Sequence, residues 1–111
     1  MKGPFIRGSH RGITRIAPGP WEEHILIRGH RYRVVKEFKD EDGDLHPIGE
    51  DWVFVGSLFS PHDELMLVVV RTRPVFEWEF ELEWRSSERD NVVEHFGDYV
   101  ELVSRDSRRI R

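Results

Sequence analysis

The stretch that most constrains the fold is VFEWEFELEW, residues 75–84, in which apolar and acidic side chains alternate. Successive side chains of a β-strand point to opposite faces, so a period of two separates the aromatic side chains from the glutamates. A helix would mix the two kinds around its circumference. The pattern therefore predicts a half-buried strand whose apolar face consists of Phe76, Trp78, Phe80, Leu82 and Trp84.

A second apolar run, ELMLVVVRT at residues 64–72, precedes this strand and is separated from it by very few residues. The spacing predicts a hairpin with a three-residue loop, residues 73–75. This loop sets apolar residues opposite one another on the inner face, in the pairs Val70–Trp78, Val68–Phe80 and Met66–Leu82. It also sets Arg71 opposite Glu77. A shift of one residue would bury the glutamates, which fixes the faces. On the outer face, Leu65, Leu67 and Val69 then need cover from another element.

Three further strands are predicted from β-branched and aromatic runs. They cover about residues 31–38, the run DWVFVGSLF at residues 51–59, and the run DYVELV at residues 98–103. Gly56 within the second run indicates a bulge or a tight bend. The long connection at residues 39–50 contains Asp42-Gly43, a pair typical of a turn.

A short helix is predicted after residue 84. Ser87 and Asp90 have the spacing of a capping box, Val92 and Phe96 lie four residues apart, and Gly97 is a natural stop. The order of elements predicts a mainly β domain with one C-terminal helix, in a small, partly open SH3-like barrel that the helix closes at one end. An antiparallel sheet with the helix packed across it is the alternative.

Charge divides the 111 residues into three zones. Residues 1–39 carry a balance of +6, residues 40–103 carry −13, and residues 104–111 carry +3. The first twenty residues contain four Gly and three Pro without a sustained pattern, which is typical of a flexible arm. We therefore expect a flexible basic arm at residues 1–20, a single β-rich domain at residues 21–103, and a disordered arginine-rich tail at residues 104–111.

Residues 29–84 contain a series of short motifs: a Gly-x-x-Tyr-x-Val strand, an Asp-x-Asp-Gly turn, a Gly-Glu-x-Trp segment and a Trp-containing final strand. The matching positions are Gly29, Tyr32, Val34, Asp40, Asp42, Gly43, Gly49, Glu50, Trp52 and Trp84. In these motifs the chain resembles a small bacterial family, domain of unknown function 3601. The resemblance supports the β-rich fold and implies no activity, cofactor or partner.

Several chemistries find no support in the residues. The chain has no cysteine, which excludes thiolate catalysis, disulfides and zinc ribbons. Asp40, Asp42 and Asp44 open with the spacing of a calcium loop, but the sixth position is Leu45 and the twelfth is Asp51, where an EF-hand needs Gly and Glu. No serine elbow or histidine metal motif is present. We therefore expect a non-enzyme without metal or cofactor; a small hydrolase or a metal-binding protein is the weakest alternative.

The first expectation for function is a non-catalytic module that binds another protein in a bacterial cytoplasm. The alternative is a nucleic-acid-binding barrel that uses the basic N-terminal zone, which the acidic body opposes. No segment is long and apolar enough to predict a membrane partner. The candidate partner-binding residues are a basic cluster and the polar face of the glutamate strand: Arg28, Arg31, Tyr32, Arg33, Glu77, Glu79 and Glu81.

Overall fold

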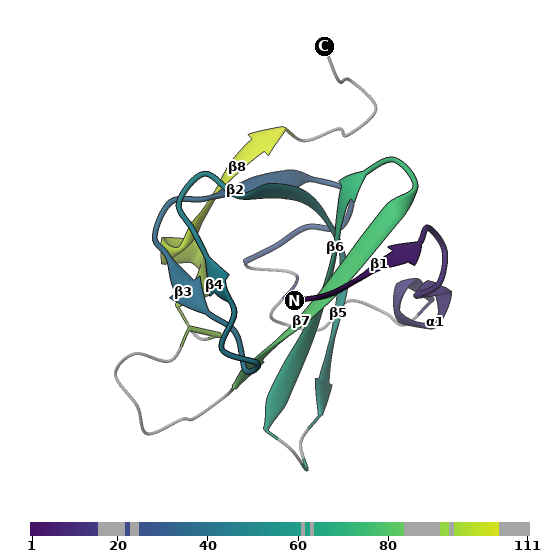
Figure 1. Ribbon diagram of the computed structural model, residues 1–111, viewed down its shortest axis with the longest axis horizontal. Helices are drawn as coiled ribbons and strands as arrows, with labels where there is room; N and C mark the ends of the chain where they lie inside the picture. Colours follow the sequence, from purple (N-terminus) through teal and green to yellow (C-terminus); the bar gives the residue numbers. More distant parts are fainter. Residues whose placement is uncertain are drawn as a thin grey trace.

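The computed structural model describes residues 1–15, 22, 25–60, 62, 64–83, 92–93 and 95–104. In these residues the chain forms a six-stranded antiparallel sheet and a two-stranded ribbon (Figure 1). The sheet contains β1 (Lys2–Ile6), β2 (Arg31–Val34), β5 (Asp51–Ser60), β6 (Leu65–Arg73), β7 (Phe76–Glu83) and β8 (Val100–Ser104). The ribbon pairs β3 (Phe38–Lys39) with β4 (Leu45–His46), and two short helical turns are α1 (Arg11–Thr14) and η1 (Phe96–Asp98).

The β6–β7 hairpin has the predicted register. Val70 pairs with Trp78, Val68 with Phe80 and Met66 with Leu82. Arg71 lies opposite Glu77, as expected. The structure differs at the turn, where a bulge at Arg71–Arg73 shortens the connection to Pro74 and Val75. The period-two pattern thus predicted the faces of the central strands, and the short spacing between the two runs predicted their pairing.

The outer face of the sheet receives the cover that its apolar residues require from α1. Ile13 of α1 packs with Val55 and Val69 in a small second core. Gly56 makes this approach possible, because a Cβ at that position would lie 2.7 Å from the Cγ2 atom of Ile13. The predicted irregularity at Gly56 is confirmed, since the β5–β6 register shifts between Phe54 and Gly56.

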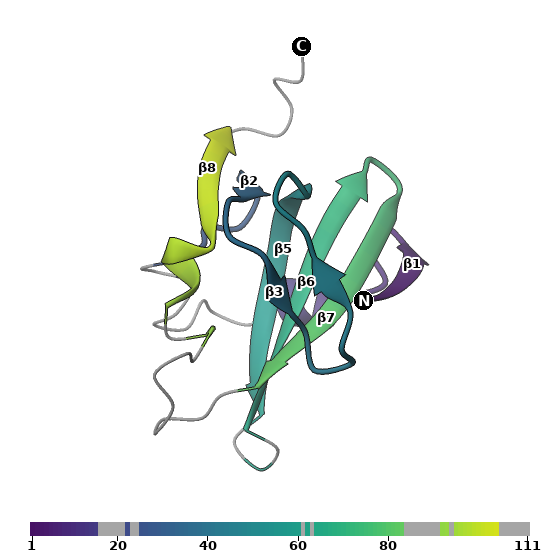
Figure 2. The same ribbon diagram turned by 60° about the vertical axis from the view of Figure 1, so that its left-hand side comes forward.

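The main core lies on the inner face of the sheet, beneath the ribbon (Figure 2). Phe38 of β3 packs at 6.0 Å from Phe80 of β7 and at 5.3 Å from Phe96, measured between ring centroids. Trp52, Phe54 and Phe80 are almost wholly buried there. The ribbon therefore closes the inner side of the sheet with aromatic side chains.

The predicted C-terminal helix is wrong. In the described residues the longest helix is α1, with four residues, and the segment before β8 contains only turns and η1. Val93 and Phe96 are both fully buried, so the chain turns tightly to place them in the core and then reverses into β8. This packing overrides the local helix signal at Val92 and Phe96. The capping-box residues 87–90 lie outside the described residues.

The mainly β part of the predicted fold is confirmed, and both versions that include a helix are corrected. Neither an SH3-like barrel closed by a helix nor a sheet with a helix across it occurs in the described residues. The order β1-β7-β6-β5-β2-β8 instead places the first and last strands at the two ends of one sheet. No helix in the described part of the chain is long and apolar enough to cross a membrane.

The N-terminal segment, predicted as a flexible arm, docks on the sheet over the part that the structure describes. Residues 2–6 form β1 and pair with β7, and α1 packs on β5. The N–H of Arg7 donates to the carbonyl oxygen of Val75 at 2.8 Å. The predicted disordered tail, apart from Ser104 at the end of β8, lies outside the described residues.

Candidate functional site

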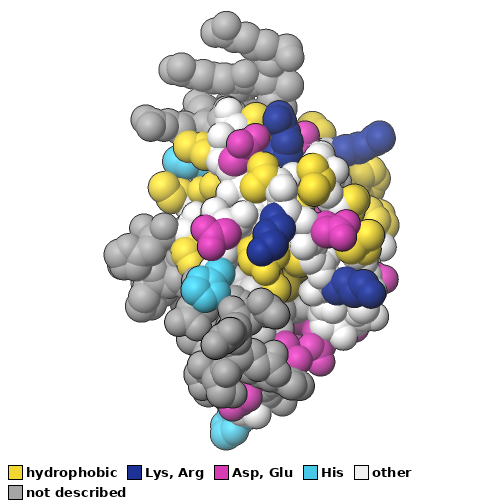
Figure 3. Space-filling view, turned by 90° about the vertical axis from the view of Figure 1, so that its left-hand side faces the viewer, with side chains coloured by type: hydrophobic (Ala, Val, Ile, Leu, Met, Phe, Trp, Pro, Cys, Tyr) yellow, Lys and Arg dark blue, Asp and Glu magenta, His cyan; other side chains and the backbone are white. Residues whose placement is uncertain are grey.

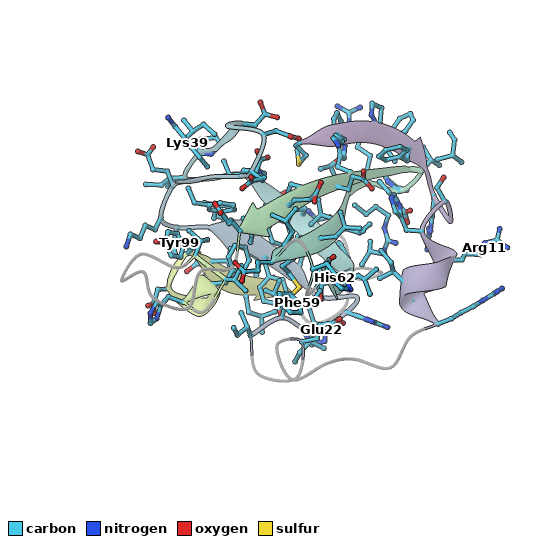
Figure 4. All side chains as sticks on the ribbon, turned by 90° about the horizontal axis from the view of Figure 1, so that it is seen from below. Arg11, Glu22, Lys39, Phe59, His62 and Tyr99 are labelled. Carbon is cyan, nitrogen blue, oxygen red and sulfur yellow. The ribbon has the colours of Figure 1, made fainter. Side chains whose placement is uncertain are left out.

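The two ends of the main sheet, β1 and β8, are the places where a sheet can accept another strand. They lie on opposite sides of the molecule (Figures 1 and 2). Figure 4 shows the same separation, with Arg11 of α1 at one end and Tyr99, which precedes β8, at the other. An edge strand presents unpaired N–H and C=O groups, so each edge is either protected or available.

The backbone of β8 directs two sets of hydrogen-bonding groups away from the sheet. Val34 of β2 uses its N–H to reach the carbonyl of Glu50 at 2.8 Å, and its carbonyl accepts the N–H of Gly49 at 2.9 Å. Val34 therefore has no backbone hydrogen-bonding group left for Val100, its partner on β8. Opposed residues alternate between hydrogen-bonded and non-bonded pairs, so Val100 and, two residues on, Leu102 point their N–H and C=O groups outward.

Among the described residues, no backbone group bonds to the outward N–H and C=O groups of Val100 and Leu102. β8 pairs only with β2 there, and no other described element forms a backbone hydrogen bond with Val100 or Leu102. The side chains of Leu102 and Val103 are 45% and 41% exposed. Figure 3 shows this side of the molecule, where apolar side chains lie among charged ones. The β8 edge thus combines free backbone groups with apolar side chains.

The β1 edge has the opposite character. Pro4 lacks an N–H, Lys2 is a charged and exposed residue, and the register shifts between Lys2 and Phe5. These are features by which natural sheets prevent further strand pairing. Two contacts also hold this edge in place: the N-terminal ammonium binds Asp40 and Asp44, and His10 binds the glutamates of β7.

His10 lies between Glu77 and Glu79, two glutamates on the predicted polar face of β7. Its Nδ1 atom is 3.0 Å from Glu77 Oε1, and its Nε2 atom is 3.1 Å from Glu79 Oε2. Both ring nitrogens of His10 therefore lie within hydrogen-bond distance of a carboxylate oxygen. Glu77 is only 3% exposed, so this part of the glutamate ladder is buried beneath the N-terminal segment. Glu81, further along β7, is half-buried and faces Leu67.

The predicted basic cluster is engaged in contacts within the chain. Arg31 Nη1 lies 3.0 Å from Asp51 Oδ1, and Arg33 Nη1 lies 3.5 Å from Glu101 Oε1. Both are cross-strand pairs on the outer face. The guanidinium of Arg28 donates to the buried carboxylate of Glu22. The structure therefore does not bring the seven candidate residues together: the three arginines are paired with carboxylates, while Glu77 and Glu79 lie against His10 on β7.

Tyr32 is part of the core and not of a surface. It is 5% exposed, its ring packs near Trp52, and its hydroxyl oxygen accepts the N–H of Ile27 at 2.8 Å. On burial the pKa of the hydroxyl rises, although the hydrogen bond from Ile27 opposes the change. Tyr32 lies directly opposite Leu102 on the inner face, which links the core to the β8 edge.

The aspartate loop is a turn closed by its own side chain. Asp40 Oδ1 accepts the N–H groups of Asp42 and Asp44 at 3.0 and 3.1 Å, and Gly43 has φ of +86°, which favours glycine. Oxygens of the three aspartates come within 4.8 Å of one another. The other oxygen of Asp40 contacts the N-terminal ammonium at 3.1 Å and His46 at 2.9 Å. Asp40 thus stabilises the turn and joins it to the core.

His46 forms a second buried histidine–carboxylate centre. Its two ring nitrogens lie 2.9 Å from Asp40 and 2.7 Å from Glu50, and its ring stacks on Phe38 with centroids 4.6 Å apart. Burial disfavours the charged imidazolium, but the hydrogen bonds to Glu50 and Asp40 outweigh it and raise the pKa of His46. For Asp40, burial alone would raise the pKa. The hydrogen bonds that Asp40 accepts from His46 and the amino terminus outweigh burial, so the pKa of Asp40 is lowered.

Sequence reasoning predicted β8 as a strand but did not place it at an edge. The strand order depends on β2 pairing with both β5 and β8, for which residues 98–103 carry no local signal. The roles of His10 and His46 were also missed, because each meets its carboxylates only through tertiary contacts. For His46, the nearby Asp40 and Glu50 were the available signal.

No protein-family model matches the chain, and no curated protein matches it. Among solved structures, an integron cassette protein from the mobile metagenome of Vibrio cholerae is similar, with a TM-score of 0.61 and 22% sequence identity. The similarity covers 68% of this chain and 83% of that one. At this identity it shows a shared fold alone. The resemblance to domain of unknown function 3601 stays a prediction.

Proposed function

We propose that this chain is a non-catalytic protein-interaction module whose partner adds a β-strand to β8. The observation that carries the proposal is the outward direction of the Val100 and Leu102 backbone groups beside exposed apolar side chains. In strand addition, main-chain hydrogen bonds provide affinity and alternate side chains provide specificity. The contrast with the protected β1 edge supports the choice of surface.

Contacts of the candidate acid–base groups support a non-catalytic role. His10 and His46 each have both ring nitrogens against carboxylates, so neither offers a nitrogen for general-base chemistry on a substrate. Ser57 donates its hydroxyl to Glu22 at 2.8 Å, and that carboxylate also binds Arg28. These groups hold elements of the fold together.

Binding of nucleic acid has less support than binding of protein. Arg31 and Arg33 of the predicted basic cluster each face a carboxylate across the sheet. A phosphate would have to displace Asp51 or Glu101, and the acidic body adds repulsion. A labelled oligonucleotide should therefore bind the intact chain no better than about millimolar at physiological salt. Micromolar binding with a steep salt dependence would favour the alternative.

A selection of random peptides on the intact chain tests strand addition. We expect enriched peptides to alternate apolar and polar residues and to protect the amides of Val100 and Leu102 from hydrogen exchange. Leu102→Lys should weaken such a peptide about tenfold or more, since a charge replaces the exposed leucine beside the added strand. The matched control is Ile6→Lys, an exposed residue on the β1 edge.

Two results would overturn the proposal. In the first, the selection yields no peptide that binds the chain. In the second, the selected peptides bind but leave the amides of β8 unprotected, or bind the Leu102→Lys and wild-type chains equally well.

A further inference from the structure

The β8 strand has the geometry to pair with itself. An antiparallel pair related by a two-fold axis at Leu102 would place Leu102 opposite Leu102 of a second copy and Glu101 opposite Val103 of that copy. Because Leu102 directs its N–H and C=O outward, the two leucines would exchange two backbone hydrogen bonds across the axis. We infer that the strand added to β8 is β8 of a second copy of this chain. The inference rests on the proposed function.

The neighbouring registers are less favourable. An axis at Glu101 sets two glutamates directly opposite each other, which is destabilising. It also uses a residue whose N–H and C=O face β2, because the pairs in this ladder alternate. An axis at Val103 falls on the residue that the register shift leaves without a partner on β2. Leu102 is the position where free hydrogen-bonding groups and an apolar side chain coincide.

Side chains on both faces are compatible with this pairing. On the inner face, Leu102 extends the cross-strand row that begins at the buried Tyr32, so two copies would form a continuous row of two leucines between two tyrosines. On the outer face, Val103 would lie opposite Glu101 of the second copy. Glu101 retains Arg33 beside it within its own chain, so no carboxylate is left without a cation.

The difference between the two edges explains why pairing would stop at two copies. Pairing of β8 with β8 joins two sheets into one whose remaining ends are both β1, the strand with Pro4 and Lys2. Pairing of β8 with β1 would leave an unpaired edge at each step and would grow into a fibre. A strand of five residues buries less surface than a stable interface usually does. We therefore expect a dimer whose population depends on concentration.

Sedimentation equilibrium of the full chain, from micromolar to near-millimolar concentration, tests the inference. The apparent mass should rise with concentration from the 13.2 kDa of one chain toward twice that value. Leu102→Lys and Leu102→Glu should each stay monomeric over the same range, because like charges then meet at the axis. An equal mixture of the two variants should restore the dimer, since opposite charges meet there.

Matched control variants are Ile6→Lys and Ile6→Glu, which place the same charges on the exposed β1 edge. Each alone, and their mixture, should dimerise as the wild-type chain does. Circular dichroism of all four variants checks that they are folded. Restoration of the dimer by mixing the two Leu102 variants requires residue 102 of one copy to lie opposite residue 102 of the other. A general loss of stability would not produce this restoration.

Three results would overturn the inference: a wild-type chain that stays monomeric, Leu102 variants that dimerise as the wild-type chain does, or a mixture that fails to restore the dimer. If selected peptides still protect β8 in a monomeric chain, strand addition stands and only the second copy is wrong. If neither peptides nor a second copy protect β8, both proposals are wrong.

Discussion

The two edges of the main sheet are built from different kinds of residue. β1 contains Pro4 and Lys2, departs from regular register, and is held by the N-terminal ammonium and by His10. β8 contains exposed Leu102 and Val103 and pairs only with β2 among the described strands. One edge is thus held by contacts within the chain, while the other has outward backbone groups beside exposed apolar side chains.

This difference shows how a small β protein can direct association. Edge strands are a general risk for aggregation, and protecting both edges would keep a sheet monomeric. Protecting only one limits growth to a single added strand. The ion pairs at β1 are therefore as important to the proposed association as the apolar residues at β8.

The largest expected effect comes from Trp78, which supports β1 from beneath. A Cβ at Gly3 would lie 2.9 Å from the indole ring, and the indole N–H donates to Thr72 Oγ1 at 3.0 Å. Trp78→Ala should lower the free energy of unfolding by about 3–4 kcal/mol, measured by urea denaturation. The control Val75→Ala, in the exposed turn, should change it by less than about 0.5 kcal/mol. Equal losses would mean that β1 does not depend on this ring.

The next largest effect on stability is expected from His10, which contacts Glu77 and Glu79 beside β1. His10→Ala would leave the buried Glu77 without its hydrogen-bond partner and should cost about 2–3 kcal/mol. In the Glu77→Gln background the same substitution should cost clearly less, because the buried carboxylate that His10 contacts is gone. A double-mutant cycle by chemical denaturation measures the coupling. Strictly additive losses would contradict the contact.

The third prediction is that the stability contributed by the contacts of His46 with Asp40 and Glu50 depends on pH. Because the pKa of His46 is raised, its stabilising contribution is complete below the unfolded value of about 6.5 and is lost as the pH rises through the folded value. The lowered pKa of Asp40 acts at the other end, so its contribution is lost as the pH falls through its folded value. Stability from this centre should therefore be greatest at mildly acidic pH.

Thermal unfolding from pH 5 to pH 9 measures this dependence. His46→Gln should flatten the decline that begins near pH 6.5. A decline above pH 8 should remain, because contacts with Asp44 and Asp40 outweigh burial and also raise the pKa of the N-terminal ammonium. A wild-type profile that rises from pH 6.5 to pH 9, or a decline that His46→Gln leaves unaltered, would contradict the assignment.

The smallest expected effect on stability belongs to the open edge. Leu102→Thr keeps a strand-forming residue at a half-exposed position, so the free energy of unfolding should change by less than about 0.5 kcal/mol. The same substitution should weaken dimerisation measurably, as followed by sedimentation. A large loss of stability would mean that Leu102 serves the core and not an interface.

The sequence was most informative where one local pattern determines several contacts. Strict alternation at Phe76–Glu83 indicated the strand and its faces, the short spacing to β6 predicted the register, and Gly56 marked the bulge. β1 could not be predicted, because its glycine and proline interrupt any period and its pairing with β7 is distant in sequence. The helix prediction relied on local signals that the burial of Val93 and Phe96 overrides.

The candidate site was predictable only in part. DYVELV was recognised as a strand, yet its edge position depends on which strand lies next to β2. The glutamates of β7 were assigned to a polar face because their alternation is visible, while His10, which contacts two of them, is 67 residues from Glu77. Tertiary contacts of this kind leave no period in the sequence.

Placement of the first and last strands at the sheet edges has a kinetic consequence. The β6–β7 hairpin closes through two residues, whereas the Arg33–Glu101 contact between β2 and β8 spans 68 residues and the His10–Glu77 contact spans 67. Closing such long loops costs more entropy, so the central strands should assemble first and the terminal strands should add after the rate-limiting barrier. Substitutions in β8 should then accelerate unfolding and leave the refolding rate nearly constant.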